Sequence, residues 1–213
     1  NLEEVFLANS KEAIWQLSPL GRGSNSTNTQ EGSNFIIHPF LSFLAQLKLN
    51  EAFVDSFEET DQRLTHWIAY HQGTGYYYSY KYKIFNSTDE PTEYSMVFRL
   101  AEQYLIRAEA RARQDDLDGA LADLDKIRGR AGIDLIADTN PNISRTELLD
   151  LIMEERRKEL FTEWGHRWLD LKRTGRTAEI FGSDPLWEET DVLYPIPEAD
   201  RLKNPNLTQN DGY

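Results

Sequence analysis

The segment from Arg99 to Arg173 limits the possible folds of this chain more than any other part of the sequence. It opens with two runs in which apolar side chains recur at the three- and four-residue spacing of an α-helix. The first run contains Leu100, Tyr104, Leu105, Ala108 and Ala112, and the second contains Leu117, Ala120, Leu121, Leu124 and Ile127. A short polar turn separates them, so we predict two antiparallel helices over residues 97–114 and 117–130.

The turn and the small residues of this hairpin indicate how its helices pack. Asp116 stands directly before the second run, where its carboxylate can cap the helix. Tyr104, Ala108, Ala120 and Leu124 fall at the large-small-small-large positions of a tetratricopeptide repeat, in which small residues let the helices approach closely. One such hairpin cannot bury both of its faces, and the sequence holds one clear copy. We therefore expect neighbouring repeats to pack against it.

A further helix is predicted after this hairpin, and it carries carboxylates on its apolar side. On a helix, Leu148, Ile152, Glu155 and Glu159 lie within about 60° of one another. Buried carboxylates need partners, so we expect a structural ion-pair network. Its expected members are Glu155, Arg156, Glu159, Arg167 and Asp170, with Arg157 and Lys172 as further candidate cations. The alternative interpretation is a pair of catalytic carboxylates, as in glycoside hydrolysis.

Three motifs in this half of the chain resemble those of one protein family. They are the hairpin, the pattern E-R-R-x-E-L-F-x-E-x-G-H-R-W-x-D-L-K-R from Glu155, and a C-terminus that runs from V-L-Y-P-I-P at Val192 to N-P-N-L-T-Q-N-D-G-Y. In this order they resemble the C-terminal part of the SusD/RagB family over at least residues 99–213. The resemblance implies a mainly α fold of tetratricopeptide-like helical hairpins with long irregular loops and a small β element, a SusD-like α-α superhelix.

The resemblance also implies a function. Members of this family are surface-exposed lipoproteins of the Bacteroidetes outer membrane, which capture glycans or other nutrients for a SusC-like TonB-dependent transporter. We therefore expect a non-catalytic binding protein whose partners are an oligosaccharide and such a transporter, with no cofactor. One alternative is a tetratricopeptide-type scaffold for protein interactions. A more distant one is a glycoside hydrolase that uses Glu155 and Glu159.

The resemblance divides the chain into three expected regions. Residues 1–98 would form a loop-rich region on the ligand side, residues 99–174 the helical repeat core, and residues 175–213 an extended C-terminal tail. Members of the family are about twice as long, so we expect this chain to correspond to their C-terminal part, without the N-terminal half. The chain also lacks the cysteine through which the family is lipidated.

Composition excludes several other classes of protein. The net charge of −13 would repel nucleic acid phosphates. The absence of cysteine excludes disulfides, thiolate catalysis and cysteine-ligated zinc. No apolar run approaches the roughly 18 residues of a membrane-spanning helix. The histidines are dispersed, and we predict neither a metal site nor a catalytic residue.

The first 98 residues give weaker structural signals. We predict a strand over residues 11–17, a polar loop over 18–34, a helix over 39–57 and a short helix over 61–70. Residues 76–84 alternate in the manner of a strand, with tyrosines at every second position. These elements would surround the helical core.

Aromatic residues are the best candidates for contact with a sugar, because their flat faces can stack on sugar C–H groups. In the family that the chain resembles, such residues stand on variable loops together with polar side chains. The candidate ligand-binding residues are Trp67, Tyr70, His71, Tyr76, Tyr77, Arg22, Asn25 and Asn28. The competing interpretation places Trp67 in the core and the tyrosines on strand faces covered by helices.

Overall fold

The computed structural model describes residues 1–20, 26–45 and 47–213, and within them the chain is mainly helical. Arg22 and Asn25, two of the candidate ligand-binding residues, lie outside the described residues. The chain forms two compact units, Asn1–Trp164 and Gly165–Tyr213. Among the described residues, no helix combines the length and the apolar character needed to cross a bilayer.

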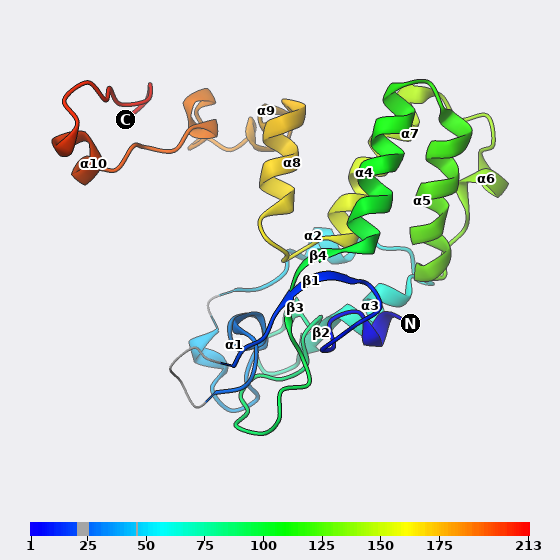
Figure 1. Cartoon of the computed structure of the whole chain (residues 1–213), viewed down its shortest axis with the longest axis horizontal. Helices are drawn as coiled ribbons and strands as arrows, with labels where there is room; N and C mark the ends of the chain where they lie inside the picture. The colour runs from blue at the N-terminus through cyan, green and yellow to red at the C-terminus, as the bar shows by residue number, and fades with distance from the viewer. Residues whose placement is uncertain (21–25, 46) are drawn as a thin grey trace. The chain divides into compact units, whose positions relative to one another are not determined.

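The core of the first unit is the predicted helical hairpin. Helix α4 spans Leu100–Arg113 and α5 spans Leu117–Ala131, which confirms the two expected helices (Figure 1). The Asp116 carboxylate accepts a hydrogen bond of 3.0 Å from the Gly119 amide, as the capping prediction requires. Helix α5 ends where Gly132 adopts a φ of 76°, a left-handed conformation that glycine tolerates best.

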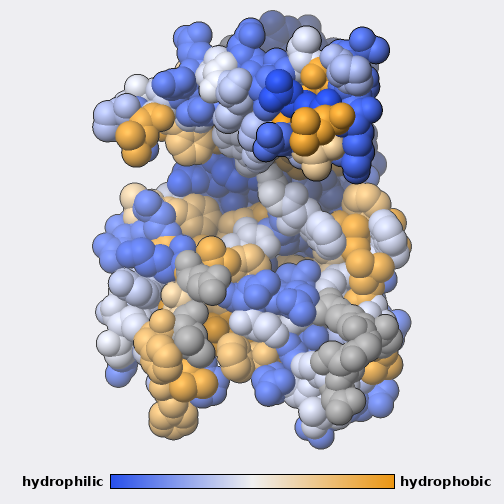
Figure 2. Space-filling view, turned by 90° about the vertical axis from the view of Figure 1, so that its left-hand side faces the viewer, coloured by the Kyte–Doolittle hydropathy of each residue, from blue (hydrophilic) through white to orange (hydrophobic). Residues whose placement is uncertain are grey.

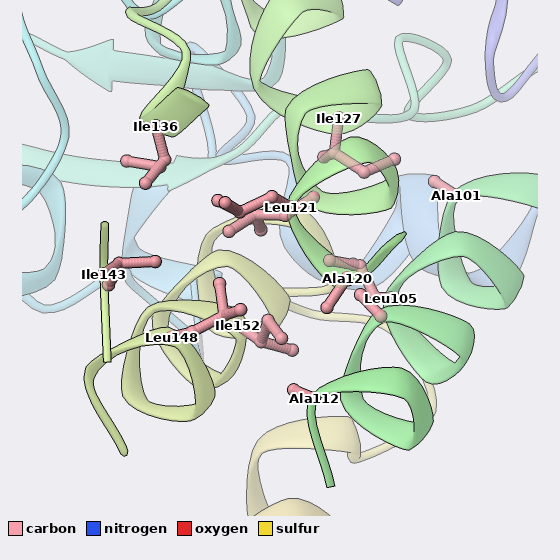
Figure 3. Close-up of a cluster of buried hydrophobic side chains, with 12 residues drawn as sticks. Ala101, Leu105, Ala112, Ala120, Leu121, Ile127, Ile136, Ile143, Leu148 and Ile152 are labelled. Carbon is pink, nitrogen blue, oxygen red and sulfur yellow. The ribbon is translucent and has the colours of Figure 1, made fainter. Parts of the chain in front are cut away.

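A third helix, α7, packs against α4 and α5. It spans Arg145–Glu159, and Ser144 and Glu147 form a capping box at its start. Leu148 and Ile152 of α7 are fully buried, and Figure 3 shows them directed toward Leu121 of α5. Ala108 and Ala120 are also fully buried, so small residues stand where the two hairpin helices meet. A short helix, α6 (Ile136–Thr139), follows α5 and adds Ile136 to the same cluster.

Two small antiparallel sheets complete the first unit. Strand β1 (Ala13–Leu17) pairs with β4 (Ser95–Arg99), and β2 (Ile68–His71) pairs with β3 (Tyr76–Ser79) as a hairpin. A second apolar cluster packs beside them. Its members include Leu2, Val5, Phe6, Phe53, Phe57, Trp67, Met96 and Phe161. Leu2 belongs to a 3-10 helix, η1 (Leu2–Glu4).

The prediction of one helix over residues 39–57 is wrong. Among the described residues of this segment, the helical elements are a 3-10 turn, η2 (Ser42–Leu44), and a single helical turn, α2 (Glu51–Val54). Phe40 and Phe43 remain 88% and 79% exposed, so the apolar spacing of this segment reflects no buried helix face. Figure 2 shows apolar residues at the surface in the lower part of its view. Asn50 caps α2 through the Ala52 amide and so starts a new element.

The other elements predicted for the N-terminal region differ from the structure mainly in their bounds. The loop predicted over residues 18–34 is wrong at its end, because the Thr29 side chain caps helix α1 (Gln30–Phe35) through the Gly32 amide. Helix α3 (Gln62–Trp67) is shorter than predicted, because the chain becomes extended at Ile68 and continues as β2. Strand β3 ends at Ser79, before the end of the tyrosine alternation.

The second unit contains short helices and an aromatic cluster. Its elements are α8 (His166–Thr174), α9 (Thr177–Phe181), the 3-10 helix η3 (Glu189–Val192) and α10 (Glu198–Lys203). The ring of Trp168 lies 6.2 Å from Phe181 and 6.4 Å from both Trp187 and Tyr194. The Gln209 amide makes two hydrogen bonds, of 2.7 and 3.1 Å, with the backbone of Ile196. The C-terminal segment is therefore fixed to the proline-containing stretch before it.

Candidate functional site

Glu159, the last residue of α7, lies in a buried network of ion pairs in the first unit. Its side chain is fully buried, and its carboxylate accepts hydrogen bonds from Arg63, Arg99 and Arg130. Burial opposes ionisation of Glu159, but the three guanidinium groups outweigh it and hold the pKa of this carboxyl well below its ordinary value. Glu159 is therefore ionised at neutral pH.

Glu155, one turn earlier on α7, belongs to the same network. Its carboxylate accepts hydrogen bonds of 2.5 Å from Arg63 and 3.3 Å from Arg128. Arg63 is itself fully buried, and it also binds the Asp61 carboxylate through two of its nitrogens. The prediction that Glu155 and Glu159 are buried and paired with arginines is confirmed.

The partners of these carboxylates differ from the predicted ones. The four arginines that bind them come from α3, from the junction of β4 with α4, and from α5, and Arg63 is 92 residues away from Glu155 in sequence. Arg167 and Asp170, two predicted members, stand on α8 in the second unit, where Asp170 accepts a 2.7 Å hydrogen bond from Arg173. Arg156 is buried on α7 beside the network. The predicted set relied on nearness in sequence, and the structure draws its cations from distant segments.

The geometry of this network disfavours catalysis by Glu155 and Glu159. A glycosidase needs one carboxyl that holds a proton near neutral pH, which requires a raised pKa. The pKa of Glu159 is instead lowered, and both carboxylates point at guanidinium groups inside the protein. Neither residue lines any of the described hollows.

The network also fixes both ends of the β2–β3 hairpin. Arg63 stands on α3, directly before β2, and Lys81 stands just after β3. The Lys81 ammonium donates hydrogen bonds to the Glu159 carbonyl (2.7 Å), the Phe161 carbonyl (2.9 Å) and the Glu163 carboxylate (2.5 Å). Burial lowers the pKa of Lys81 to about 8, although Glu163 opposes this shift. The hairpin is thus attached to the end of α7 on both sides.

We expect this network to make the fold sensitive to acid. Because the pKa of Glu159 in the folded chain lies below its ordinary value of 4.5, the unfolded chain binds more protons as the pH falls through that value. The stabilisation is therefore complete above about pH 4.5 and is lost as the pH falls towards the folded-state pKa. Urea midpoints measured from about pH 7 to about pH 3 should fall steeply in the native chain and less steeply in Glu159→Gln. Equal slopes in the two proteins would contradict this assignment.

The largest described hollow lies beside this anchored hairpin. Its volume is about 460 Å³, within the range of small-molecule sites. It is lined by Val54, Asp55, Phe57, Glu59, Leu64, Ile68, Ala69, Tyr70 and Tyr77. We call it the Tyr70–Tyr77 hollow. Two of the predicted ligand-binding residues therefore meet at one site.

The register of the hairpin explains why these two tyrosines meet. Tyr70 of β2 lies directly opposite Tyr77 of β3, and their ring centroids are 4.9 Å apart at an angle of 52°. Tyr70 is 52% exposed, so its ring is open to a ligand. Neighbouring strand residues point to opposite faces, and Tyr76 accordingly does not line the hollow. The ammonium of Lys48 lies 4.3 Å from the centroid of the Tyr76 ring.

The other candidate ligand-binding residues that the structure describes are not among the residues that line the hollow. Trp67 is only 1% exposed, and its indole donates a 3.1 Å hydrogen bond to the Leu2 carbonyl, so it is a core residue. The competing interpretation of Trp67 was the correct one. His71 accepts a 3.1 Å hydrogen bond from the Thr74 amide within the hairpin turn. Asn28 is buried and holds loop backbone, including the Phe85 carbonyl at 3.0 Å, beside a smaller hollow of about 130 Å³.

Sequence reasoning missed the polar residues of the hollow. Asp55 and Glu59 line it, both are exposed, and neither carboxylate has a hydrogen bond or ion pair among the described residues. Both residues follow α2. Asp55 falls in the helix predicted over residues 39–57, and Glu59 falls between that helix and the one predicted over residues 61–70, so neither prediction places them beside the β2–β3 hairpin. Among the described residues, no group of three or more histidine or acidic side chains could hold a metal ion.

Comparisons with known proteins agree with the fold. The model of the SusD family matches residues 71–185. The chain is 32% identical over 123 residues to a SusD-like protein of Formosa agariphila, a match that covers 55% of this chain and 24% of that relative. It is 36% identical over 130 residues to the starch-binding protein SusD of Bacteroides thetaiotaomicron, with coverage of 55% and 21%.

A solved structure extends this similarity to nearly the whole chain. A SusD-like protein of Bacteroides fragilis superimposes with a TM-score of 0.76 at 18% identity, and the match covers 99% of this chain and 56% of that one. At this identity the likeness concerns the fold alone. The chain therefore spans little more than half the length of this neighbour, and its alignments span about a quarter or less of the curated relatives.

Proposed function

This chain belongs to the SusD family, and from that premise we propose that it binds a glycan in the Tyr70–Tyr77 hollow without cleaving it. The observation that carries the proposal is the pair of opposed tyrosine rings, one of them half exposed, at the edge of a hollow of ligand size. A relative that shares 36% identity over the aligned part is named as a starch-binding protein. We further propose the role of the family, which is delivery to a SusC-like TonB-dependent transporter at the outer membrane.

The chemistry of the hollow suits a sugar. Tyrosine rings offer flat apolar faces to sugar C–H groups, and their hydroxyls can exchange hydrogen bonds with the ligand or water. Asp55 and Glu59 supply acceptors for sugar hydroxyls, because an ionised carboxylate accepts hydrogen bonds and cannot donate them. Apolar contacts and a few oriented polar groups are the usual composition of a small-molecule site.

Binding without cleavage follows from the arrangement of the carboxylates. A glycosidase pair needs two carboxyls in different environments, one protonated and one ionised. Asp55 and Glu59 are both exposed, so neither is set apart from the other by burial. The buried pair, Glu155 and Glu159, is saturated with arginines. We therefore assign no catalytic residue.

Calorimetry against a panel of oligosaccharides tests this proposal. Tyr70→Ala and Tyr77→Ala should each weaken binding by roughly tenfold, which corresponds to about 1.4 kcal/mol, because each removes one stacking face. Tyr76→Ala is the matched control, since its ring belongs to the same strand but does not line the hollow, and it should leave affinity unchanged. Both the native chain and its variants should leave the oligosaccharides intact.

Two results would contradict the proposal. Equal affinities in the native chain and in both hollow variants would remove the hollow from the binding site. Shortened sugar products in the calorimetry cell, detected by mass spectrometry, would contradict binding without cleavage.

A further inference from the structure

We propose that the Tyr70–Tyr77 hollow selects uncharged glycans and disfavours acidic ones, such as chains of uronic acid or sulfated sugars. This inference rests on the proposed glycan-binding role of the hollow and adds the class of ligand. The residues that carry it are Asp55 and Glu59, the two charged side chains among the residues that line the hollow.

The two carboxylates keep their full negative charge available to a ligand. Both are exposed, and neither makes a hydrogen bond or an ion pair with any other described residue. A sugar hydroxyl can donate a hydrogen bond to either of them, whereas a ligand carboxylate or sulfate has no proton to donate and is repelled. The pair therefore favours neutral rings over anionic rings of the same shape.

Two cations, Arg63 and Lys158, lie near the ring of Phe57 but do not themselves line the hollow. Arg63 lies 5.7 Å from the Phe57 ring centroid, but it is fully buried and already bound to Asp61, Glu155 and Glu159. The Lys158 ammonium lies 5.5 Å from the centroid of the same ring, yet Lys158 is not among the residues that line the hollow. Among the residues that the structure describes, the lining of the hollow includes no lysine, arginine or histidine.

The expected selectivity is moderate because the carboxylates face water. Two unit charges about 6 Å from a ligand anion in water oppose its binding by roughly three- to tenfold together. Salt should weaken this effect, since the Debye length falls from about 30 Å at 0.01 M to about 3 Å at 1 M ionic strength. The stacking contribution of the tyrosines depends much less on salt.

The test compares ligands that differ at C6 alone, where a neutral CH2OH group is replaced by a carboxylate. Gluco-oligosaccharides of several linkages are paired with the 6-carboxylate forms of the same linkage and length, and dissociation constants are measured by calorimetry at about 0.01 M and about 1 M salt. For the linkage that binds, the native chain should prefer the neutral form by roughly three- to tenfold at low salt and by much less at high salt. The double variant Asp55→Asn/Glu59→Gln should lose most of this preference.

A control variant separates the local effect from net charge. Asp118 of α5 and Glu198 of α10 are exposed and are not among the residues that line the hollow, so Asp118→Asn/Glu198→Gln removes the same amount of charge without changing the lining. This control should keep the native preference. Circular dichroism should show that both double variants are folded, since all four changes are isosteric and exposed.

The outcomes distinguish this inference from the function on which it rests. A native chain that binds both forms equally, or a preference that survives in Asp55→Asn/Glu59→Gln, would overturn the selectivity. If Tyr70→Ala still weakened binding in that case, the glycan site would stand. Absence of saturable binding to every oligosaccharide would overturn the proposed function and the selectivity together.

Discussion

Replacing Glu159 with glutamine should lower the free energy of unfolding by about 3–5 kcal/mol. The substitution keeps the volume of the side chain and removes its charge, so Arg63, Arg99 and Arg130 lose the anion that they share. Arg99 is held further by Glu163, Arg63 by Asp61 and Arg130 by Glu12, yet Arg63 and Arg99 are buried and cannot regain water in exchange for the lost charge. Urea denaturation of the two proteins measures the difference.

The same helix provides the control. Glu154 is 44% exposed and pairs with Arg157 at 3.2 Å, so Glu154→Gln removes one carboxylate from a surface pair. Such pairs contribute at most about 1 kcal/mol, and the control should remain close to the native chain. A Glu159→Gln protein as stable as this control would show that the buried network contributes little to the fold.

The helical core was predictable from the sequence because its determinants are local. The hairpin of α4 and α5 follows from the spacing of apolar residues, two small residues at the contact and an aspartate cap, all within about 30 residues. The burial of Glu155 and Glu159 was also predictable, because both lie on the apolar stripe of a long helix. Periodicity identifies which face is buried.

The arginines that pair with Glu155 and Glu159 were not predictable in the same way. The guanidinium of Arg63 reaches Glu155 from 92 residues away, and no spacing rule relates the two positions. Nearness in sequence favoured Arg156 and Arg167 instead, although α8 belongs to a separate compact unit. A chain of 213 residues has many possible ion pairs between distant residues, and its tertiary structure determines which of them form.

The aromatic candidates show a related limit. Trp67 and Tyr70 are three residues apart, yet one is in the core and the other is half exposed, because the chain changes from α3 to β2 between them. The helix predicted over residues 61–70 would have placed both on one face. The incorrect prediction of a helix over residues 39–57 similarly gave no sign that Asp55 is a neighbour of the tyrosines, and Glu59 fell in the short stretch between two predicted helices. The residues at which helices end and strands begin therefore determine which of the candidate residues line the hollow.

The network and the hollow are physically connected through the hairpin. Arg63 precedes β2 and Lys81 follows β3, and both bind the segment from Glu155 to Glu163 at the end of α7. The Ser79 hydroxyl adds a 2.8 Å hydrogen bond to Thr162. The tyrosine pair therefore stands on a hairpin that the core holds in place, and a rigid platform loses less entropy when a sugar stacks on it.

Trp67→Ala should destabilise the chain by about 3–5 kcal/mol, and it should not act as a binding variant. The side chain is 1% exposed and lies edge-on to Phe6, with ring centroids 5.6 Å apart. Its ring also lies 4.8 Å from the Lys81 ammonium, so the truncation opens a cavity beside a buried cation. Thermal or urea denaturation measures the loss, and Trp15→Ala, at a position that is 50% exposed, should cost much less.

Stability and binding must be measured separately for Trp67→Ala, because Trp67 is the last residue of α3 and β2 begins at the next residue. At a temperature where circular dichroism shows Trp67→Ala to be folded, its affinity for the best oligosaccharide should stay within about threefold of native, whereas Tyr70→Ala should lose roughly tenfold. The expected pattern is thus a large change in stability for Trp67 and a large change in affinity for Tyr70. A Trp67→Ala protein of native stability that no longer binds would instead return this tryptophan to the ligand site and contradict its assignment to the core.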